Sequence, residues 1–530
     1  MRELPAEAAL EAVELARSLP GRLVALVAYG SQVAGYATAE SDYDLLAVLE
    51  GAREGARYYY VRSPGGRYFS VLSVGAGRLE GDAERAELGE FVIGRLLNPY
   101  QVLLGGDVVE RAARAYRRRV VLEELARLAS DYGQFATEIL APPEYFLFSK
   151  LRRRARIYPP ASYSYVRTYS GPEGPANLEF SASRFREALD ELAAEGIVER
   201  VGRLYRALRP PLPRRPPEMD TLVLAVRQYA THLSSGRVSP RVFAEELSSK
   251  ARRSRAAGRL EQLERPRGLL SLPEGRLSTE GLAPLLRGCA RARTRPLGEF
   301  YSTTRELEAE CPWGTLRAVV KEYGSPWAAK WVMARVAAAG IREMRFSPAE
   351  RMAAEYAFTR LLRLAGLSTP RVLLVDPGRL VAVKEYVEGV LLERAVGDER
   401  PFRELGRILG RLHSAGVTLG DVKPSNFLVA PSSIYLIDCE QAMRGGSAAW
   451  DVASFLYFLA PLGRRRGADA VLRSALAFLE GYSSTGSVED LEAAASARYL
   501  APLSPLLQPG EAAAMAGALS RFLSSRRAAR

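Results

Sequence analysis

Histidine and cysteine are scarce in this chain of 530 residues. Two histidines make a histidine-based zinc site implausible, and three cysteines, an odd number without metal-ligand spacing, argue against a disulfide framework. No apolar run approaches the roughly 20 residues that a membrane span needs. The first 21 residues carry acids and lack the basic-then-apolar order of a signal peptide. The sequence therefore predicts a cytoplasmic protein with no membrane partner.

Lysine is also rare. The chain holds six lysines yet has a net charge of +13, so arginine supplies nearly all of the positive charge. Arginine binds phosphate through parallel N–H groups, which favours a polyanionic partner, but a GC-rich genome would produce the same composition. The hydrophobic content of 48% and charged content of 25% are typical of a folded protein. A chain of this length is expected to form about three or four domains.

Residues 412–440 hold the most informative pattern. Asp421 precedes Lys423 and Asn426, a short apolar segment and a predicted strand follow, and Asp438 comes next. Phosphoryl transfer from a nucleotide needs such a set: a carboxylate to orient the attacking hydroxyl, a lysine near the moving phosphate, and an amide with a second carboxylate to hold Mg²⁺. We therefore take Asp421 and Lys423 as candidate catalytic residues, and Asn426 and Asp438 as candidate metal ligands.

The order D-x-K-x-x-N followed by D resembles the catalytic and metal-binding loops of the protein-kinase-like fold. Upstream, Lys321 at the end of an apolar strand resembles the third-strand lysine, and Glu355 on a predicted helix resembles its glutamate partner. Residues 384–389 resemble the hinge, where backbone groups such as those of Glu385 would meet adenine. Asp451 resembles the acid that braces the catalytic loop.

Three departures separate this region from eukaryotic-type kinases. Leu419 and Gly420 stand at the usual histidine and arginine positions, Asp-Cys-Glu at 438–440 replaces Asp-Phe-Gly, and residues 298–310 offer serine and threonine instead of a glycine-rich phosphate loop. These features resemble atypical kinases of the Rio and KEOPS-kinase type and, less closely, aminoglycoside phosphotransferases. The resemblance implies ATP and Mg²⁺ as cofactors and a protein Ser/Thr hydroxyl as acceptor.

A second pattern lies near the N-terminus. A predicted strand over 23–28 runs into Gly30 and Ser31, and a second strand carries Asp42 and Asp44. Two carboxylates two residues apart on a strand point to one face and can hold paired Mg²⁺ ions, while N–H groups at Gly30 and Ser31 suit phosphate. The arrangement resembles the polymerase-beta-type nucleotidyltransferase superfamily.

Active members of that superfamily carry a third carboxylate on a later strand. The strand predicted over 68–74 has none, and the nearest candidates, Glu80 and Asp82, are expected in the loop after it. The sequence leaves two alternatives open. The domain is an active transferase, or it is a nucleotidyltransferase fold that serves only as a scaffold or a nucleotide sensor.

Between these two patterns, helices followed by two short strands resemble a winged helix-turn-helix. Arginines and tyrosines between residues 144 and 169 would suit nucleic acid, whereas a protein-docking module or a solvated basic face is the plainer interpretation. The predicted division is a nucleotidyltransferase-like domain at 1–108, a helical spacer and winged-helix-like domain at 109–208, a Pro-rich linker at 209–219, a helical connector at 220–296 and a kinase-like domain at 297–530.

The sequence thus predicts a multi-domain α+β protein with an α/β nucleotidyltransferase-like domain, a winged helix-turn-helix and a two-lobed protein-kinase-like domain, a combination suggestive of an archaeal source. We expect an ATP-dependent atypical Ser/Thr protein kinase whose N-terminal domain is regulatory. One alternative is a Mg²⁺-dependent nucleotidyltransferase that moves a nucleoside monophosphate to protein or RNA under control of the kinase domain. The other is a nucleic-acid-binding regulator with two degenerate catalytic domains.

Overall fold

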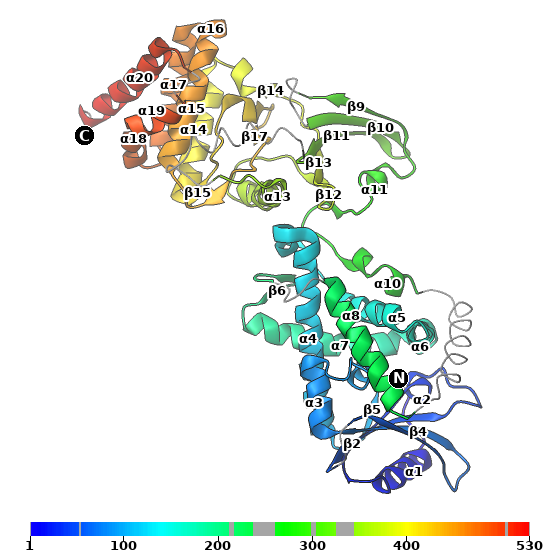
Figure 1. Cartoon of the computed structure of the whole chain (residues 1–530). Helices are drawn as coiled ribbons and strands as arrows, with labels where there is room; N and C mark the ends of the chain where they lie inside the picture. The colour runs from blue at the N-terminus through cyan, green and yellow to red at the C-terminus, as the bar shows by residue number, and fades with distance from the viewer. Residues whose placement is uncertain are drawn as a thin grey trace. The chain divides into compact units, whose positions relative to one another are not determined.

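The computed structural model describes residues 2–51, 55–210, 217–236, 260–297, 304–324, 344–503 and 507–528. The chain divides into two compact units, one formed by residues 1–132 and 136–271 and the other by residues 133–135 and 272–530 (Figure 1). The second unit thus begins before residue 297, where we begin the kinase-like domain on sequence. Among the described helices, none combines the length and apolarity that crossing a bilayer requires.

The first unit contains a five-stranded mixed sheet. Its order is β3 (Arg57–Arg62), β4 (Tyr68–Gly75), β2 (Tyr43–Glu50), β1 (Arg22–Tyr29) and β5 (Gln101–Leu104). Strands β2 and β4 run parallel, and the other neighbours are antiparallel. The central strands are almost continuously buried because helix α1 (Ala6–Arg17) covers them with alanines spaced by four residues.

The helices that follow the sheet in the first unit include α4 (Gly106–Tyr132), α5 (Pro143–Ile157), α6 (Ala161–Ser170), α7 (Gly174–Ala194) and α8 (Pro217–Ser234). The two short strands predicted after α7 are present as β6 (Val198–Val201) and β7 (Leu204–Ala207), and Gly202 between them has a φ of 64°. The predicted linker and connector contain α8, which packs within this unit. The rest of the connector up to residue 259 lies outside the described residues.

The second unit begins with a six-stranded sheet. Its order is β8 (Arg276–Leu277), β12 (Val372–Asp376), β13 (Val381–Glu385), β11 (Gly314–Glu322), β10 (Thr304–Cys311) and β9 (Ala290–Pro296). Helix α13 (Pro348–Leu364) accompanies this sheet. Strand β9 is an edge strand whose seven residues are all exposed.

The rest of the second unit is mainly helical. Its apolar core joins α14 (Glu399–Ser414), α15 (Ala448–Leu459), α17 (Ala468–Ser483), α18 (Val488–Ala494), α19 (Ala497–Leu503) and α20 (Pro509–Ala528). The same part of the unit contains two small sheets. Strands β14 (Val390–Leu391), β16 (Phe427–Val429) and β17 (Ile434–Leu436) form one, and β15 (Val417–Thr418) pairs with β18 (Met443–Arg444) in the other. The loops between these strands carry Asp421 and Asp438, which are described below.

The odd cysteine count argues against a disulfide framework, yet one disulfide is present. Cys289 and Cys311 are bonded, and Cys439 remains as a buried free thiol. The pairing follows from the sheet register, because Ala290 on β9 lies opposite Glu310 on β10 and the two cysteines are their immediate chain neighbours. An odd cysteine count excludes only complete pairing.

Candidate active site

A buried lysine–glutamate pair joins strand β11 to helix α13. Lys321, near the end of β11, donates to Glu355 Oε2 at 2.7 Å. Lys384 on β13 donates to the other oxygen of the same carboxylate, and the Tyr323 hydroxyl donates to Oε2 at 2.5 Å. Burial would raise the pKa of Glu355, but Lys321 and Lys384 hold it below its usual value. The predicted Lys321–Glu355 pair is therefore present.

Lys321 also contacts two acids from the loop after β17. Its Nζ lies 3.0 Å from Asp438 Oδ1 and 3.3 Å from Glu440 Oε2. Burial opposes ionisation of Asp438, yet Lys321 and Lys423 hold its pKa well below the usual range. Burial raises the pKa of Glu440, which Arg351 contacts at 3.1 Å. The site thus combines one firmly ionised acid with one that is easier to protonate.

The candidate catalytic loop lies between β15 and β16. Lys423 Nζ donates to Asp421 Oδ2 at 2.9 Å, and this carboxylate raises the pKa of Lys423. Asn426 Nδ2 donates to the Asp421 carbonyl at 2.9 Å and to its Oδ2 at 3.2 Å. All three residues predicted from the D-x-K-x-x-N pattern are brought together, and Asp421 is held by both neighbours.

The loops that carry Asn426 and Asp438 are tied by the backbone. Ile437 N donates to Asn426 O at 2.9 Å, next to the β16–β17 pairing. A Mg²⁺ ion prefers carboxylate and amide oxygens, and both are available here: Asp438 Oδ2, and Asn426 Oδ1 because the amide nitrogen faces Asp421. Glu355, Asp438 and Glu440 also place one oxygen each within 4.8 Å of one another. The donor set fits a divalent cation.

Asp451 braces the catalytic loop. This fully buried residue of α15 accepts the backbone N–H groups of Leu419 at 2.6 Å and Gly420 at 2.7 Å. Trp450 Nε1 donates to the Gly420 carbonyl at 2.9 Å. Gly420 has a φ of 77°, a conformation that disfavours side chains, so a glycine suits this position.

For two other predicted parts of this site, the adenine-binding hinge and the phosphate segment, the structure shows fewer of the expected contacts. Glu385 ends β13, where its carboxylate accepts from the Arg371 Nε at 2.7 Å and its backbone N–H donates to the Arg371 carbonyl; its nucleotide role stays a prediction. Residues 298–303 of the predicted phosphate segment lie outside the described residues. Thr304, the next residue, begins β10 and pairs with Lys321 in the sheet.

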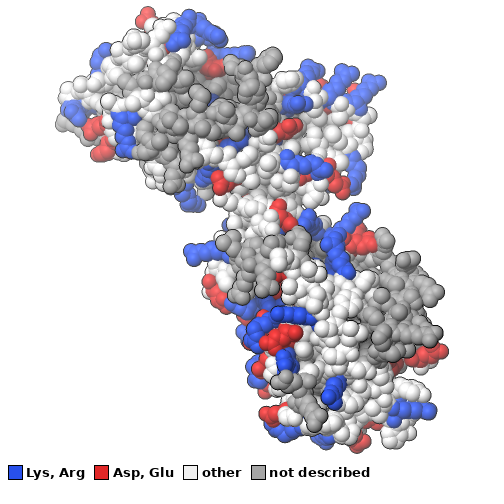
Figure 2. Space-filling model, viewed as in Figure 1, with Lys and Arg blue, Asp and Glu red and all other residues white. Residues whose placement is uncertain are grey.

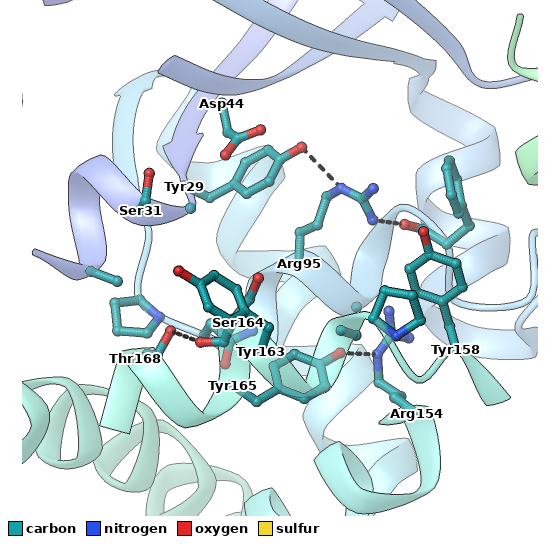
Figure 3. A pocket seen from close by; sticks show the side chains of 18 of the residues that line it. Tyr29, Ser31, Asp44, Arg95, Arg154, Tyr158, Tyr163, Ser164, Tyr165 and Thr168 are labelled. Carbon is teal, nitrogen blue, oxygen red and sulfur yellow. Dashed lines mark hydrogen bonds between the residues drawn. The ribbon is translucent and has the colours of Figure 1, made fainter. Parts of the chain in front are cut away.

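In the first unit, a cavity of about 410 Å³ lies between the sheet and helices α6 and α8 (Figure 3). Gly30, Ser31 and Asp44 line it, as the nucleotidyltransferase resemblance implies. Gly30 is pressed against Asp44, because a Cβ on Gly30 would meet Asp44 Oδ2 at 2.1 Å. Asp42 immediately precedes β2 and is not among the lining residues, so the two acids do not both face this cavity.

Neither candidate third carboxylate reaches this cavity. Both Glu80 and Asp82 lie in helix α3 (Ala76–Arg85), not in the expected loop. Asp82 is fully buried and accepts four backbone N–H groups, from Leu88, Glu90, Val92 and Ile93, so it organises the following segment. The strand neighbour of Asp44 on β4 is Ser70. A serine therefore occupies the place beside Asp44 where a third carboxylate would be expected.

Much of the predicted basic and aromatic surface is turned inward. Lys150 and Arg154 on α5 are buried and paired with Glu90, and Tyr165 and Tyr169 on α6 are buried. In Figure 2, acidic and basic side chains are intermixed on the described part of the face drawn. This arrangement weakens the interpretation that the winged-helix-like segment binds nucleic acid.

Several residues of both sites escaped sequence reasoning. Lys384, Glu440 and Arg351 join the kinase-like site through contacts between distant segments, although the rarity of lysine gave a signal for Lys384. Arg95 and Gln228 line the cavity of the first unit. These residues belong to no local sequence motif, so the spacing of residues along the chain could not identify them.

No protein-family model matches the chain. The KEOPS complex subunit Bud32 of Pyrococcus abyssi is 40% identical over 88 residues, 15% of this chain and 40% of that protein. A probable serine/threonine-protein kinase BUD32 homolog of Archaeoglobus fulgidus is 32% identical over 130 residues, 24% of this chain and 64% of that protein. A probable bifunctional tRNA threonylcarbamoyladenosine biosynthesis protein of Methanosarcina acetivorans is 32% identical over 124 residues, 23% of this chain and 22% of that protein.

The chain thus spans less than two thirds of the length of each of these relatives. Together with the Lys321–Glu355 pair, the similarity confirms a kinase-like region of Bud32 type. The nucleotidyltransferase and winged-helix assignments remain predictions. The chain forms two compact units, and the kinase-like assignment rests on the sequence similarity to these relatives.

Proposed function

We propose that the second unit is an ATP- and Mg²⁺-dependent kinase that phosphorylates a serine or threonine hydroxyl of a protein. The observation that carries this proposal is the convergence of five side chains from four separate segments on one place: Lys321, Glu355, Asp421, Asn426 and Asp438. Phosphoryl transfer depends mainly on positioning and on neutralising charge, and this set supplies groups for both.

Each residue has a defined task in this proposal. Lys321, fixed by Glu355, binds the α- and β-phosphates. Asp421 accepts the proton of the attacking hydroxyl, and Lys423, held at 2.9 Å from it, neutralises the transferred group. Asn426 and Asp438 would hold Mg²⁺, which would neutralise phosphate charge when bound.

The relatives favour a protein acceptor. The Archaeoglobus fulgidus relative is named a probable serine/threonine-protein kinase, and the Pyrococcus abyssi relative is named a subunit of the KEOPS complex. A protein partner for this chain is consistent with both names. The segment between Asp438 and Asp451 is short and contains β18, which leaves little chain for a separate regulatory loop.

The test is transfer of label from gamma-labelled ATP with Mg²⁺, to the chain itself or to an added acceptor protein. Asp421→Asn should lower the rate by about 10²–10⁴-fold because it removes the proton acceptor while keeping shape. Asp469→Asn, at an exposed carboxylate of α17, is the matched control and should retain full activity. Label transfer that survives Asp421→Asn, or that appears only as free phosphate, would contradict the proposal.

The nucleotidyltransferase alternative has weaker support. Asp44, Gly30 and Ser31 share a cavity, but Ser70 stands beside Asp44 and Asp82 is committed to backbone N–H groups. A parallel reaction with alpha-labelled ATP tests it: transfer that is lost in Asp44→Asn would restore this function.

A further inference from the structure

The cavity of the first unit contains a cation that the kinase proposal does not use. Arg95 is half-buried and donates only to neutral oxygens in the described part of the chain: the Tyr29 hydroxyl at 3.0 Å, the Tyr58 hydroxyl at 2.5 Å and the Phe91 carbonyl (Figure 3). The other arginine of the cavity, Arg154, differs because Glu90 lies 3.3 Å from it. Arg95 is therefore a positioned cation that no carboxylate among the described residues pairs with.

These contacts fix the position of Arg95 but do not use all of its N–H groups. Its guanidinium also lies over the rings of Phe91, at 4.7 Å, and Tyr29, at 5.6 Å. A guanidinium has five N–H groups, and the described contacts use three of them. The remaining pair suits the oxygens of a phosphate, which guanidinium binds through parallel hydrogen bonds.

Aromatic rings form much of the remaining wall. Tyr158 follows α5, and Tyr163 and Tyr165 project from α6, as Figure 3 shows; Tyr36 and Tyr229 also line the cavity. Rings in such a wall bind flat ligands by stacking. A volume of about 410 Å³ falls in the lower part of the roughly 300–1,000 Å³ range of small-molecule sites.

A buried amide oxygen supplies the second observation that points to a ligand. Gln228 of α8 lines the cavity and is only 8% exposed, yet its Oε1 has no hydrogen-bond partner among the described residues. A buried acceptor without a donor is costly unless something binds it. An N–H or O–H of a bound molecule can supply this donor, in place of the ordered water that would otherwise satisfy the oxygen.

Metal ions have little support here. Asp44 is the one acid among the described residues that line the cavity, Asp42 is not among them, and Ser70 lies beside Asp44. Recognition of an anion therefore falls to Arg95 and not to a pair of carboxylate-bound cations.

We propose that this cavity binds a nucleoside monophosphate without a metal ion. The phosphate lies on Arg95, the base stacks against the tyrosines, and an N–H or O–H of the base or sugar donates to Gln228. Nucleoside monophosphates combine these three features: an anionic group, a flat ring and hydrogen-bond donors. The site concerns the first unit alone and does not depend on the proposed kinase activity.

The test is isothermal titration of the full chain with AMP, GMP, CMP and UMP in EDTA, with inorganic phosphate and adenosine as separate probes. At least one monophosphate should bind with a Kd below about 100 µM, and phosphate or adenosine alone should bind more weakly. Arg95→Gln should raise the Kd at least tenfold. Arg118→Gln, at a surface arginine that pairs with Glu195, should leave it unchanged.

Gln228→Met keeps the proposal testable if Arg95→Gln unfolds the unit. Because Gln228 Oε1 has no described partner, this change should leave the melting temperature unchanged and still weaken binding. The proposal is overturned if no monophosphate binds, or if Kd is unchanged in both variants. Binding that requires Mg²⁺ and disappears in Asp44→Asn would also overturn it, in favour of a metal-dependent site.

Discussion

Lys384 binds the carboxylate of Glu355 at the oxygen opposite the one that accepts from Lys321. Two lysines on neighbouring strands thus share one glutamate. We expect Lys321→Met to lower kcat/KM for ATP-dependent transfer at least 100-fold, because the phosphates lose their lysine. The fold should be retained, since Lys384 still pairs with Glu355, although Asp438 and Glu440 lose one of their cations. Lys384→Met should instead lower the free energy of unfolding by about 1.5–3 kcal/mol, the usual loss for a hydrogen bond to a charged group.

Steady-state kinetics and urea unfolding on both variants separate these two roles. All four tryptophans lie at or after residue 313, so tryptophan fluorescence follows the second unit alone. A loss of activity in Lys384→Met as large as that in Lys321→Met would argue against a division of labour between the lysines.

Asp451→Ala should destabilise the second unit strongly. The change leaves the backbone N–H groups of Leu419 and Gly420 buried without their acceptor, at about 1–3 kcal/mol for each. Asp451→Asn keeps one acceptor oxygen and should cost less. Urea midpoints from tryptophan fluorescence measure both, with the exposed Asp469→Asn as reference; an unchanged midpoint in Asp451→Ala would contradict the bracing role.

The stability of the first unit should fall in acid because of Glu90. Burial would raise the pKa of this fully buried acid, but Lys150 at 2.5 Å, Arg119 at 3.0 Å and Arg154 at 3.3 Å hold it well below the usual range. A folded-state pKa below the unfolded value of about 4.3 means that the contribution is complete above that pH. It is lost as the pH falls from about 4.3 toward the folded-state pKa.

Glu90→Gln is the variant that isolates this contribution. Its stability deficit relative to the wild type should be largest near neutral pH and should narrow as the pH falls toward 3. Far-UV circular dichroism follows both units and tryptophan fluorescence follows the second alone, so the transition seen only by circular dichroism reports the first unit, which has no tryptophan. A deficit that stays constant between pH 7 and pH 3 would show that Glu90 does not titrate differently in the two states.

Reduction of the Cys289–Cys311 bond should weaken the edge of the six-stranded sheet. The bond closes a loop of 22 residues, for which chain entropy gives about 3 kcal/mol. Strand β9 buries none of its residues, so little else than backbone pairing and the bond attaches it. Hydrogen exchange in β9 should therefore rise in dithiothreitol. Cys289→Ala with Cys311→Ala should reproduce this rise without reductant, and unchanged exchange would contradict the prediction.

The kinase-like site could be predicted from sequence because its groups are fixed locally. Asp421, Lys423 and Asn426 lie within one short loop, and Lys321 ends a strand that apolar spacing reveals. What escaped prediction depends on register and long-range packing. The cysteine pair requires β9 beside β10, the exclusion of Asp42 from the cavity depends on where β2 begins, and Gln228 reaches that cavity from a helix predicted as a connector.

Strand β9 also bears on self-association. Exposed sheet edges invite pairing with a second copy of the chain, and positive charges on an edge oppose it. Arg291, Arg293 and Arg295 alternate along β9, and their charges are only partly met by Glu308 and Glu310 at 3.4 and 3.8 Å. Pairing two such edges would bring like charges together. These charges therefore oppose aggregation at β9, even though no described strand pairs with its outer edge.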